Sequence, residues 1–147
     1  MPQLHTSHRS RRIATLAFAA IALLAIALPA QGATSSKRVV KQAQNATLGK
    51  TVLTTLAGRT LYTLSAETGG TFICKRGCLA VWHPLYVAPG IKPTGPVKLG
   101  AIKRPDNGRR QVTFQGRPLY TFDGDSKAGD AKGEGIKDVG TWHAATP

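Results

Sequence analysis

Two cysteines and two histidines are the residues of this chain whose types and spacing most readily suggest chemistry. Cys74 and Cys78 are the only cysteines, so they can form one disulfide or serve as a redox-active pair. Lys75 and Arg76 lie between them, and such basic neighbours favour the thiolate and keep the redox alternative open. A disulfide across so short a loop would stabilise the fold by about 2 kcal/mol, which makes it a local clamp.

A tryptophan precedes each of these two histidines, giving the pairs Trp82-His83 and Trp142-His143. If a pseudo-twofold axis relates the two segments, the imidazoles of His83 and His143 could approach each other and bind a copper ion or haem iron. Alternation along a strand indicates the opposite, because each histidine then lies on the face away from a buried tryptophan and is exposed. From the sequence, both interpretations stay open.

Sequence motifs of the common enzyme classes are missing. The chain has no Gly-x-Ser-x-Gly, no His-Glu-x-x-His and no nucleotide-binding loop, and two of its four histidines lie in the first eight residues. Nothing singles out a pair of carboxylates for glycoside hydrolysis. We predict that the protein is not an enzyme and has no cofactor, with copper or haem at the two histidines as the alternative.

The N-terminal segment has the features of a cleavable signal peptide. Arg9, Arg11 and Arg12 form a basic region ahead of the apolar stretch 13–28, and a proline and small residues follow. The apolar stretch is shorter than the about 20 residues that span a bilayer, so cleavage is expected rather than a retained anchor. No cysteine lies near the cleavage region, so no lipid anchor is expected. We predict a secreted or periplasmic protein with no membrane span once residues 1–33 are removed.

The exported part of the chain is strongly basic. Residues 1–33 hold three of the 20 Lys and Arg and none of the 7 Asp and Glu, which leaves 17 basic residues, 7 acidic residues and a net charge of +10. This charge favours anionic cell-wall polymers or an envelope protein as partner, although it could simply maintain solubility. The basic residues are scattered and no nucleic-acid-binding motif is present, so specific nucleic-acid binding is not expected. We expect a monomer.

Two related segments organise the rest of the chain. Gly-Arg-Thr-Leu-Tyr-Thr-Leu over residues 58–64 recurs as Gly-Arg-Pro-Leu-Tyr-Thr-Phe over residues 116–122. Each segment follows a β-branched run and a tight turn, which predicts one β-hairpin per copy. A period of two places the tyrosine and the last residue of each segment on one face, and the leucine before the tyrosine on the other.

These segments predict a mainly β fold. We expect two related β-hairpin units packed as a small sandwich or barrel-like sheet, with long irregular loops and one disulfide. Residues 34–47 are mostly small and polar and are predicted to be a flexible linker. Residues 48–147 would then form a single β domain of two repeats, 48–96 and 97–147.

The mature domain resembles the bacterial "secreted repeat" proteins, predicted lipoproteins described by a Tyr-x-(Phe/Trp/Tyr)-x-x-Asp motif. The second copy has the whole motif, whereas the first has Leu64 at the aromatic position and Glu67 at the acidic one. The cysteines and Trp-His-Pro of the first copy, and the Gly-Asp, spaced glycines and tryptophan of the second, also match the family in order. The residues that the resemblance marks are Tyr62, Leu64, Glu67, Trp82, Tyr120, Phe122, Asp125, Gly129, Asp130 and Trp142.

The acidic residues of the second copy are expected to serve structure. Asp123, Asp125 and Glu134 are spaced as in a calcium-binding loop, but Lys127 and Ala128 stand where a ligand and a glycine are required. We therefore expect these carboxylates to cap turns. Asp125, as the acid of the motif, is expected to bind a backbone N–H or a hydroxyl across the repeat.

The resemblance covers residues 48–147 and implies the fold and an extracytoplasmic location, but no defined activity. We expect both motif tyrosines to be core residues with bonded hydroxyls; the alternative is that they are surface aromatics. We predict a non-catalytic binding or accessory module at the bacterial cell envelope. The alternative is an extracytoplasmic redox or metal-handling accessory protein that uses copper or haem.

Overall fold

The two copies of the Gly-Arg-x-Leu-Tyr motif meet in the middle of one four-stranded sheet. β4 (Tyr62–Leu64) and β11 (Tyr120–Phe122) lie antiparallel, with their first residues, both tyrosines, directly paired. β12 (Trp142–Ala144) flanks β4 and β5 (Trp82–Pro84) flanks β11, so the order is β12-β4-β11-β5. An approximate twofold axis between the two tyrosines therefore relates one copy to the other.

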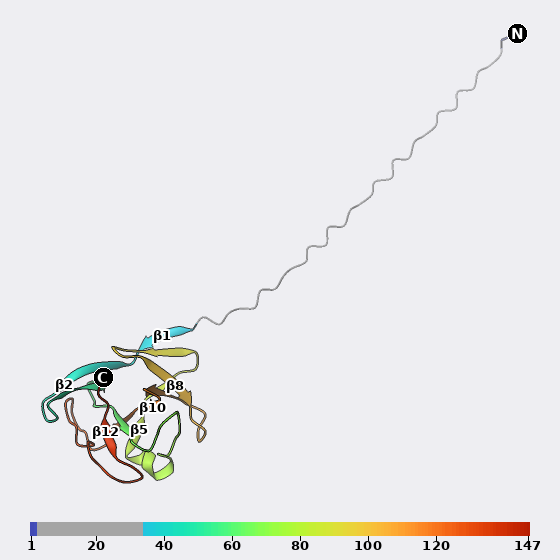
Figure 1. The fold of residues 1–147 in the computed structure, drawn as a ribbon. Coiled ribbons are helices and arrows are strands. Elements are labelled where there is room, and N and C mark those ends of the chain that lie inside the picture. The colour runs from blue at the N-terminus through green and yellow to red at the C-terminus, as the bar shows by residue number, and fades with distance from the viewer. Residues whose placement is uncertain (3–33) are drawn as a thin grey trace. The chain divides into compact units, whose positions relative to one another are not determined.

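The computed structural model describes residues 1–2 and 34–147, and residues 34–147 belong to one compact unit (Figure 1). Strands make up 42% of the structure and helix 4%, which confirms the predicted mainly β class. The helix is a single 3-10 turn, η1 (Arg76–Ala80), and no helix of the described residues is long and apolar enough to cross a membrane. The strands form several sheets, and in the part described none closes into a barrel. The predicted signal peptide lies outside the described residues apart from its first two.

Each copy begins with an antiparallel pair of strands that leads into the motif. In the first copy β2 (Val40–Asn45) pairs with β3 (Lys50–Thr55), and in the second β8 (Leu99–Lys103) pairs with β9 (Arg110–Phe114). The chain then turns at the glycine of the motif, which has a positive φ in both copies and adopts it without strain. In the second copy β10 (Arg117–Pro118) extends the hairpin by two residues paired with β9.

The prediction of a flexible linker over residues 34–47 is wrong. Two strands lie there, β1 (Ser35–Arg38) and β2, and all six residues of β2 pair with β3. Val40 packs in a hydrophobic cluster and Asn45 bonds to a loop of the second copy, so both ends of β2 are buried. The residues between them are mostly polar and exposed, which is why the composition suggested a linker. The first copy therefore begins at β2, as the counterpart of β8, and not at residue 48.

The two copies exchange their Trp-His strands. β5 belongs to the first copy but pairs with β11 of the second, and β12 belongs to the second copy but pairs with β4 of the first. Just beyond β12, Ala145 bonds to two residues of the first hairpin, Leu53 and Leu61, which also remain bonded to each other at 2.9 Å. The N–H of Leu53 donates to Ala145 O at 2.7 Å, and the N–H of Ala145 donates to Leu61 O at 2.8 Å.

Leu85 takes the same place in the second hairpin. The N–H of Val112 donates to Leu85 O at 2.8 Å, and the N–H of Leu85 donates to Leu119 O at 2.9 Å. Each predicted hairpin is therefore short, because it opens after its turn and admits the strand end of the other copy. Figure 1 shows one result, the C-terminus lying beside β2.

Two hydrophobic clusters are separated by the alternation of side chains along the central strands. The first cluster comprises Val52, Tyr62, Leu64, Cys74, Trp82, Tyr120, Trp142 and Ala144. The second cluster comprises Val40, Leu53, Leu61, Val112, Phe114, Leu119 and Ala145. The tyrosine of each motif falls in one cluster and the leucine before it in the other, as a period of two predicts.

One part of the fold is not duplicated. After β5 the first copy continues into β6 (Tyr86–Val87), which pairs with β9, and β7 (Ile91–Thr94), which pairs in parallel with β1. Within the described residues no strand follows β12 in the same way. β1 and β7 form a two-stranded sheet of their own, and β7 lies against β8.

Candidate functional site

The tyrosine of each motif donates a hydrogen bond to the acid of the other motif. Tyr62 donates to Asp125 Oδ2 at 2.8 Å, and Tyr120 donates to Glu67 Oε1 at 3.1 Å. All four residues are at most 1% exposed. Asp125 Oδ1 also accepts from the N–H of Lys132 at 2.9 Å. The prediction that Asp125 binds a hydroxyl or N–H across the repeat is confirmed. Glu67 of the first copy likewise binds the hydroxyl of Tyr120 in the second.

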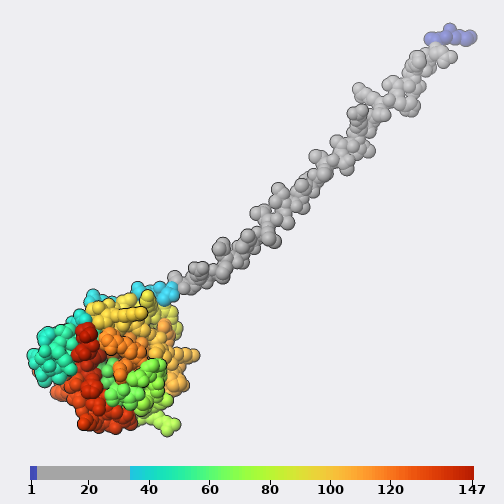
Figure 2. Space-filling view, in the orientation of Figure 1, coloured from blue at the N-terminus to red at the C-terminus, as the bar shows by residue number. Residues whose placement is uncertain are grey.

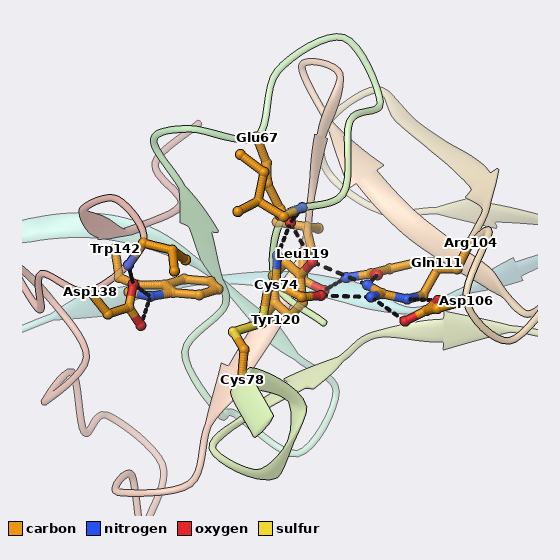
Figure 3. The surroundings of a disulfide bond; sticks show 12 residues. Glu67, Cys74, Cys78, Arg104, Asp106, Gln111, Leu119, Tyr120, Asp138 and Trp142 are labelled. Carbon is orange, nitrogen blue, oxygen red and sulfur yellow. Dashed lines mark hydrogen bonds and ion pairs between the residues drawn. A yellow bond between two sulfur atoms is a disulfide. The ribbon is translucent and has the colours of Figure 1, made fainter. Parts of the chain in front are cut away.

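The predicted disulfide between Cys74 and Cys78 is present and holds the loop that receives Glu67 (Figure 3). The two Cα atoms are 5.3 Å apart, and η1 lies at this bridge. Glu67 Oε1 accepts the N–H of Ile73 at 2.6 Å and that of Cys74 at 2.8 Å. Burial raises the pKa of Glu67 above its usual range, although these hydrogen bonds and that from Tyr120 act in the opposite direction. The disulfide thus fixes the loop whose backbone N–H groups bind the carboxylate of Glu67.

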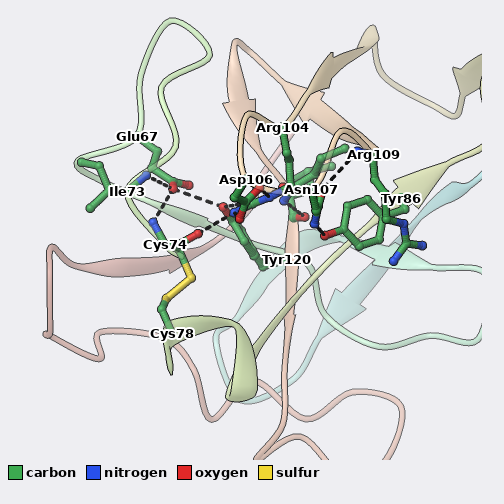
Figure 4. Close-up of polar contacts among 12 residues, drawn as sticks. Glu67, Ile73, Cys74, Cys78, Tyr86, Arg104, Asp106, Asn107, Arg109 and Tyr120 are labelled. Carbon is green, nitrogen blue, oxygen red and sulfur yellow. Dashed lines mark hydrogen bonds and ion pairs between the residues drawn. A yellow bond between two sulfur atoms is a disulfide. The ribbon is translucent and has the colours of Figure 1, made fainter. Parts of the chain in front are cut away.

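Arg104 joins this loop to the tyrosine of the second copy (Figure 4). Its buried guanidinium donates to Cys74 O at 2.7 Å, Tyr120 Oη at 3.2 Å and Gln111 Oε1 at 2.6 Å. Asp106 accepts two further bonds at 2.9 Å each. Burial by itself lowers the pKa of Arg104, but the bonds to Asp106 and Tyr120 raise it overall, and the same pairing lowers the pKa of Asp106. Neither Arg104 nor Gln111 was marked by any sequence signal.

The arginine of each motif also reaches the other copy. Arg59 Nη2 donates to Phe122 O at 2.7 Å. Arg117 Nη1 donates to Ser65 O at 3.0 Å and to Leu64 O, the counterpart of Phe122 O, at 3.4 Å. The repeated sequence is therefore explained position by position: the glycine makes the turn, the arginine and tyrosine bind the other copy, and the leucine fills the second cluster.

Trp82 and Trp142, the tryptophans on the exchanged strands, stack at the centre of the first cluster. Their ring centroids are 3.7 Å apart and their planes differ by 10°. Tyr62 meets Trp82 edge-on at 5.4 Å, and Tyr120 meets Trp142 edge-on at 5.1 Å. Burial, and then the neighbouring carboxyl group, raise the pKa of both tyrosines far above its ordinary value. The tyrosines are core residues with bonded hydroxyls, as predicted, and not surface aromatics.

The Gly-rich loop after β11 is fastened to the first copy. Asn45 Nδ2 donates to Gly129 O at 3.0 Å, and Thr60 Oγ1 donates to Asp130 O at 2.6 Å. A Cβ at Gly133 would lie 2.8 Å from a buried tryptophan ring, so only glycine fits there without a shift of its neighbours. The family-marked Gly-Asp pair and this glycine thus position the loop across the repeat.

Of the two interpretations of His83 and His143, the structure agrees with exposed side chains and not with imidazoles that approach each other. They lie on β5 and β12, the outer strands of the central sheet, and three strand spacings place those strands about 14 Å apart. Two imidazoles that share one ion need nitrogens within about 4 Å of each other. Both side chains are about half exposed, and each contacts a carboxylate: His83 contacts Asp123 at 3.3 Å and His143 contacts Glu134 at 3.0 Å.

No metal-binding group is formed within the part of the chain that the structure describes. Among these residues there is no group of three or more His, Cys, Asp or Glu side chains placed to hold an ion. The calcium-like spacing of the acids therefore does not bring them together. The carboxyl of Asp125 is instead bound by a tyrosine hydroxyl and a backbone N–H.

Asp130 provides a pH-dependent contribution to stability. Its Oδ2 accepts the N–H of Ser126 at 2.9 Å, the hydroxyl of Ser126 at 3.0 Å and the N–H of Lys127 at 3.2 Å. The N–H of Ser126 contributes most to lowering the pKa of Asp130, which falls to about 2. A carboxyl whose pKa is lower in the folded than in the unfolded state stabilises the fold above about pH 4, and this stabilisation is lost as the pH falls to about 2.

We therefore expect the melting temperature of the wild type to fall more steeply than that of Asp130→Asn between about pH 5 and pH 2. The two curves should converge at the acid end, because the wild-type carboxyl is then neutral as well. Glu67 titrates in both proteins and does not affect the difference. Thermal unfolding followed by circular dichroism at stepped pH makes the comparison, and two parallel curves would refute this role of Asp130.

All acidic residues are hydrogen-bonded to other groups of the protein, whereas most basic residues have no carboxylate partner. Each of the seven is hydrogen-bonded to another group: Glu67, Asp106, Asp123, Asp125, Asp130, Glu134 and Asp138. Of the 17 Lys and Arg in residues 34–147, Arg104 and Lys132 form ion pairs with carboxylates. No carboxylate of the described residues lies within 4.0 Å of the other fifteen. With 17 basic and 7 acidic residues, this part of the chain has a net charge of +10, and most of its basic side chains form no close ion pair.

Comparison with known proteins identifies the second copy. Residues 101–146 match the model of a family described as a secreted repeat of unknown function. The predicted resemblance is confirmed over this segment, which contains the full motif, the Gly-Asp pair and the second tryptophan. No curated protein and no solved structure matches the chain.

Proposed function

We propose that this chain, whose residues 101–146 match a secreted repeat, is an exported, non-catalytic module that binds anionic polymers of the cell envelope. One observation carries the proposal: each of the seven carboxylates is hydrogen-bonded to another group of the protein, while fifteen of the 17 Lys and Arg have no carboxylate partner among the described residues. Fixed cationic charge of this kind attracts polyanions over long range. The basic and then apolar N-terminal segment supports export, and the match to a family described as secreted agrees with it.

The positions of the titratable groups support a non-catalytic role. General acid–base catalysis needs side chains that can reach a substrate and exchange protons with it. Glu67 and Asp125 are buried and bonded to tyrosines of the opposite copy, so they serve the fold. The exposed His83 and His143 lie on opposite edges of the central sheet and do not act on one point.

Retention on purified cell walls tests this function. The exported chain should be held at low salt and released as ionic strength rises, because exposed charges are screened beyond about 10 Å at 0.1 M salt. Walls stripped of their anionic polymers are the control and should retain little protein. Retention that is insensitive both to salt and to polymer removal would refute the proposal.

A further inference from the structure

A groove lies between β7, which belongs to the part of the fold that has no duplicate, and β8. One hollow of about 330 Å³ is lined by both strands and by Arg110. A second, of about 270 Å³, shares Lys92 and Leu99 with the first, and a third, of about 510 Å³, shares Leu99 and Gly100 with it. The three hollows therefore adjoin one another along β8, and we refer to them together as the groove. Because it lies outside the exchanged strands, changes in it need not disturb the joint between the copies.

Basic side chains border this groove and no acidic side chain does. Lys92 and Lys98 are exposed at its edges, and Arg110 lies between its strands and donates to Ile91 O at 3.0 Å. β1 extends the basic border: Ser36 pairs with Lys92, so Arg38, two residues further on, is on the same face as Lys92. Figure 2 shows β1 and β7 side by side on this exposed face, in cyan and yellow.

The sequence around the groove contains no carboxylate that could neutralise these charges. Residues 34–66 and 68–105 include no Asp or Glu at all. Asp106, the next acid along the chain, is bonded to the buried Arg104. Arg38, Lys92 and Lys98 form no ion pair with any carboxylate of the described residues. The groove therefore has a fixed positive charge of its own.

The groove surface between the basic side chains is apolar, and this helps to decide which class of polyanion it binds. Pro93 and Leu99 line the groove, and Phe114 lies at its far end but is only 8% exposed. Single-stranded nucleic acid is usually held by exposed aromatic rings on which its bases stack, and none of the groove residues offers one. A chain of small uncharged units joined by phosphodiesters needs no such platform and can place a phosphate at each basic side chain.

We propose that this groove binds a linear phosphodiester polymer of the cell wall, with Arg38, Lys92 and Lys98 contacting its phosphates. This inference rests on the proposed function and assigns its site and its ligand class. The duplicated strands form the scaffold, and the binding surface lies where the segment added to the first copy meets β8 and β9 of the second.

The test compares two triple variants that remove the same charge from different places. Arg38→Gln/Lys92→Gln/Lys98→Gln neutralises the groove, and Lys127→Gln/Lys132→Gln/Lys137→Gln neutralises the Gly-rich loop after β11. All six residues are exposed, so both variants should melt close to the wild type, which is checked first. Affinity for a synthetic glycerol-phosphate oligomer is then measured by titration calorimetry at several salt concentrations.

The groove variant should bind about tenfold or more weakly, with a salt dependence lower by two to three phosphate contacts, while the control variant stays within about threefold of the wild type. Equal weakening of both variants would overturn the groove assignment and leave the proposed function standing. A wild type that fails to bind both the oligomer and intact walls would overturn both. Equally tight binding of single-stranded DNA, or binding to anionic vesicles alone, would overturn the ligand class.

Discussion

Arg104→Met is expected to lower the free energy of unfolding by about 3–5 kcal/mol, because removing one member of a buried charged network leaves its partners unpaired. The variant loses five hydrogen bonds at once. Gln111 Oε1 and Cys74 O, both in buried residues, would be left without these donors, and such orphaned groups are costly. Methionine retains most of the volume, so the loss reports the network and not a cavity.

Arg109→Met is the matched control. This residue is exposed and stacks on the ring of Tyr86, with its guanidinium carbon 3.6 Å from the ring centroid. An exposed cation–π contact contributes about 0.5–1 kcal/mol, so the control should lose no more than that. Urea denaturation of the three proteins gives the comparison. Similar losses for the two variants would show that Arg104 is not the link between the disulfide loop and the second copy.

Trp82→Ala is expected to lower the free energy of unfolding by about 3–5 kcal/mol. Trp82 is 2% exposed and packs against Trp142, Phe122 and Tyr62. It belongs to the first copy but lies on the strand that pairs with the second. Its removal should therefore weaken both copies together, and unfolding should remain a single transition.

Tyr86→Ala provides the aromatic control for this change. Tyr86 is on the next strand, is half-buried and lies outside both hydrophobic clusters. Its truncation should cost clearly less than that of Trp82 when both are measured by urea denaturation. Equal losses, or a separate early transition of one copy in Trp82→Ala, would contradict the exchange of strands.

The sequence allowed the local features of the fold to be predicted where a short-range rule applies. A period of two placed Tyr62 and Leu61 in different clusters, and two lone cysteines in a chain with a predicted signal peptide indicated their disulfide. The motif also identified Asp125 as an acid with a partner in the other copy. Each of these inferences depends on residues close in sequence or on a duplicated pattern.

Features that depend on long-range pairing could not be predicted. Nothing in the sequence says that β5 pairs with β11 and not with its own hairpin, because the two copies are alike and either pairing satisfies the same pattern. The same exchange moves His83 and His143 to opposite edges. Residues 34–47 contain few apolar residues, so their composition suggested a linker. Most of β2 is nevertheless held by backbone pairing with a single strand, β3, which needs few buried side chains. Arg104 is a single charge whose partners come from its own turn, the disulfide loop and two strands, β9 and β11.

The hydrogen bonds made by the carboxylates relate the architecture to the proposed function, because the acids are bonded to groups of the protein and most basic side chains have no carboxylate partner. Glu67 and Asp125 hold the copies together, and the remaining acids bind an arginine, two histidines, a tryptophan and backbone N–H groups. These seven carboxylates stand against 17 Lys and Arg in residues 34–147, so the folded part has a net charge of +10.

The most direct measurement of the joint between the copies is a pair of double-mutant cycles on the free energy of unfolding. Tyr62→Phe is combined with Asp125→Asn, the acid of the other copy, and separately with Glu67→Gln, the acid of its own copy. We predict a coupling of about 0.5–3 kcal/mol for the crossed pair and a clearly weaker one for the pair within a copy. Stronger coupling of Tyr62 to Glu67 than to Asp125 would contradict a fold built on reciprocal exchange.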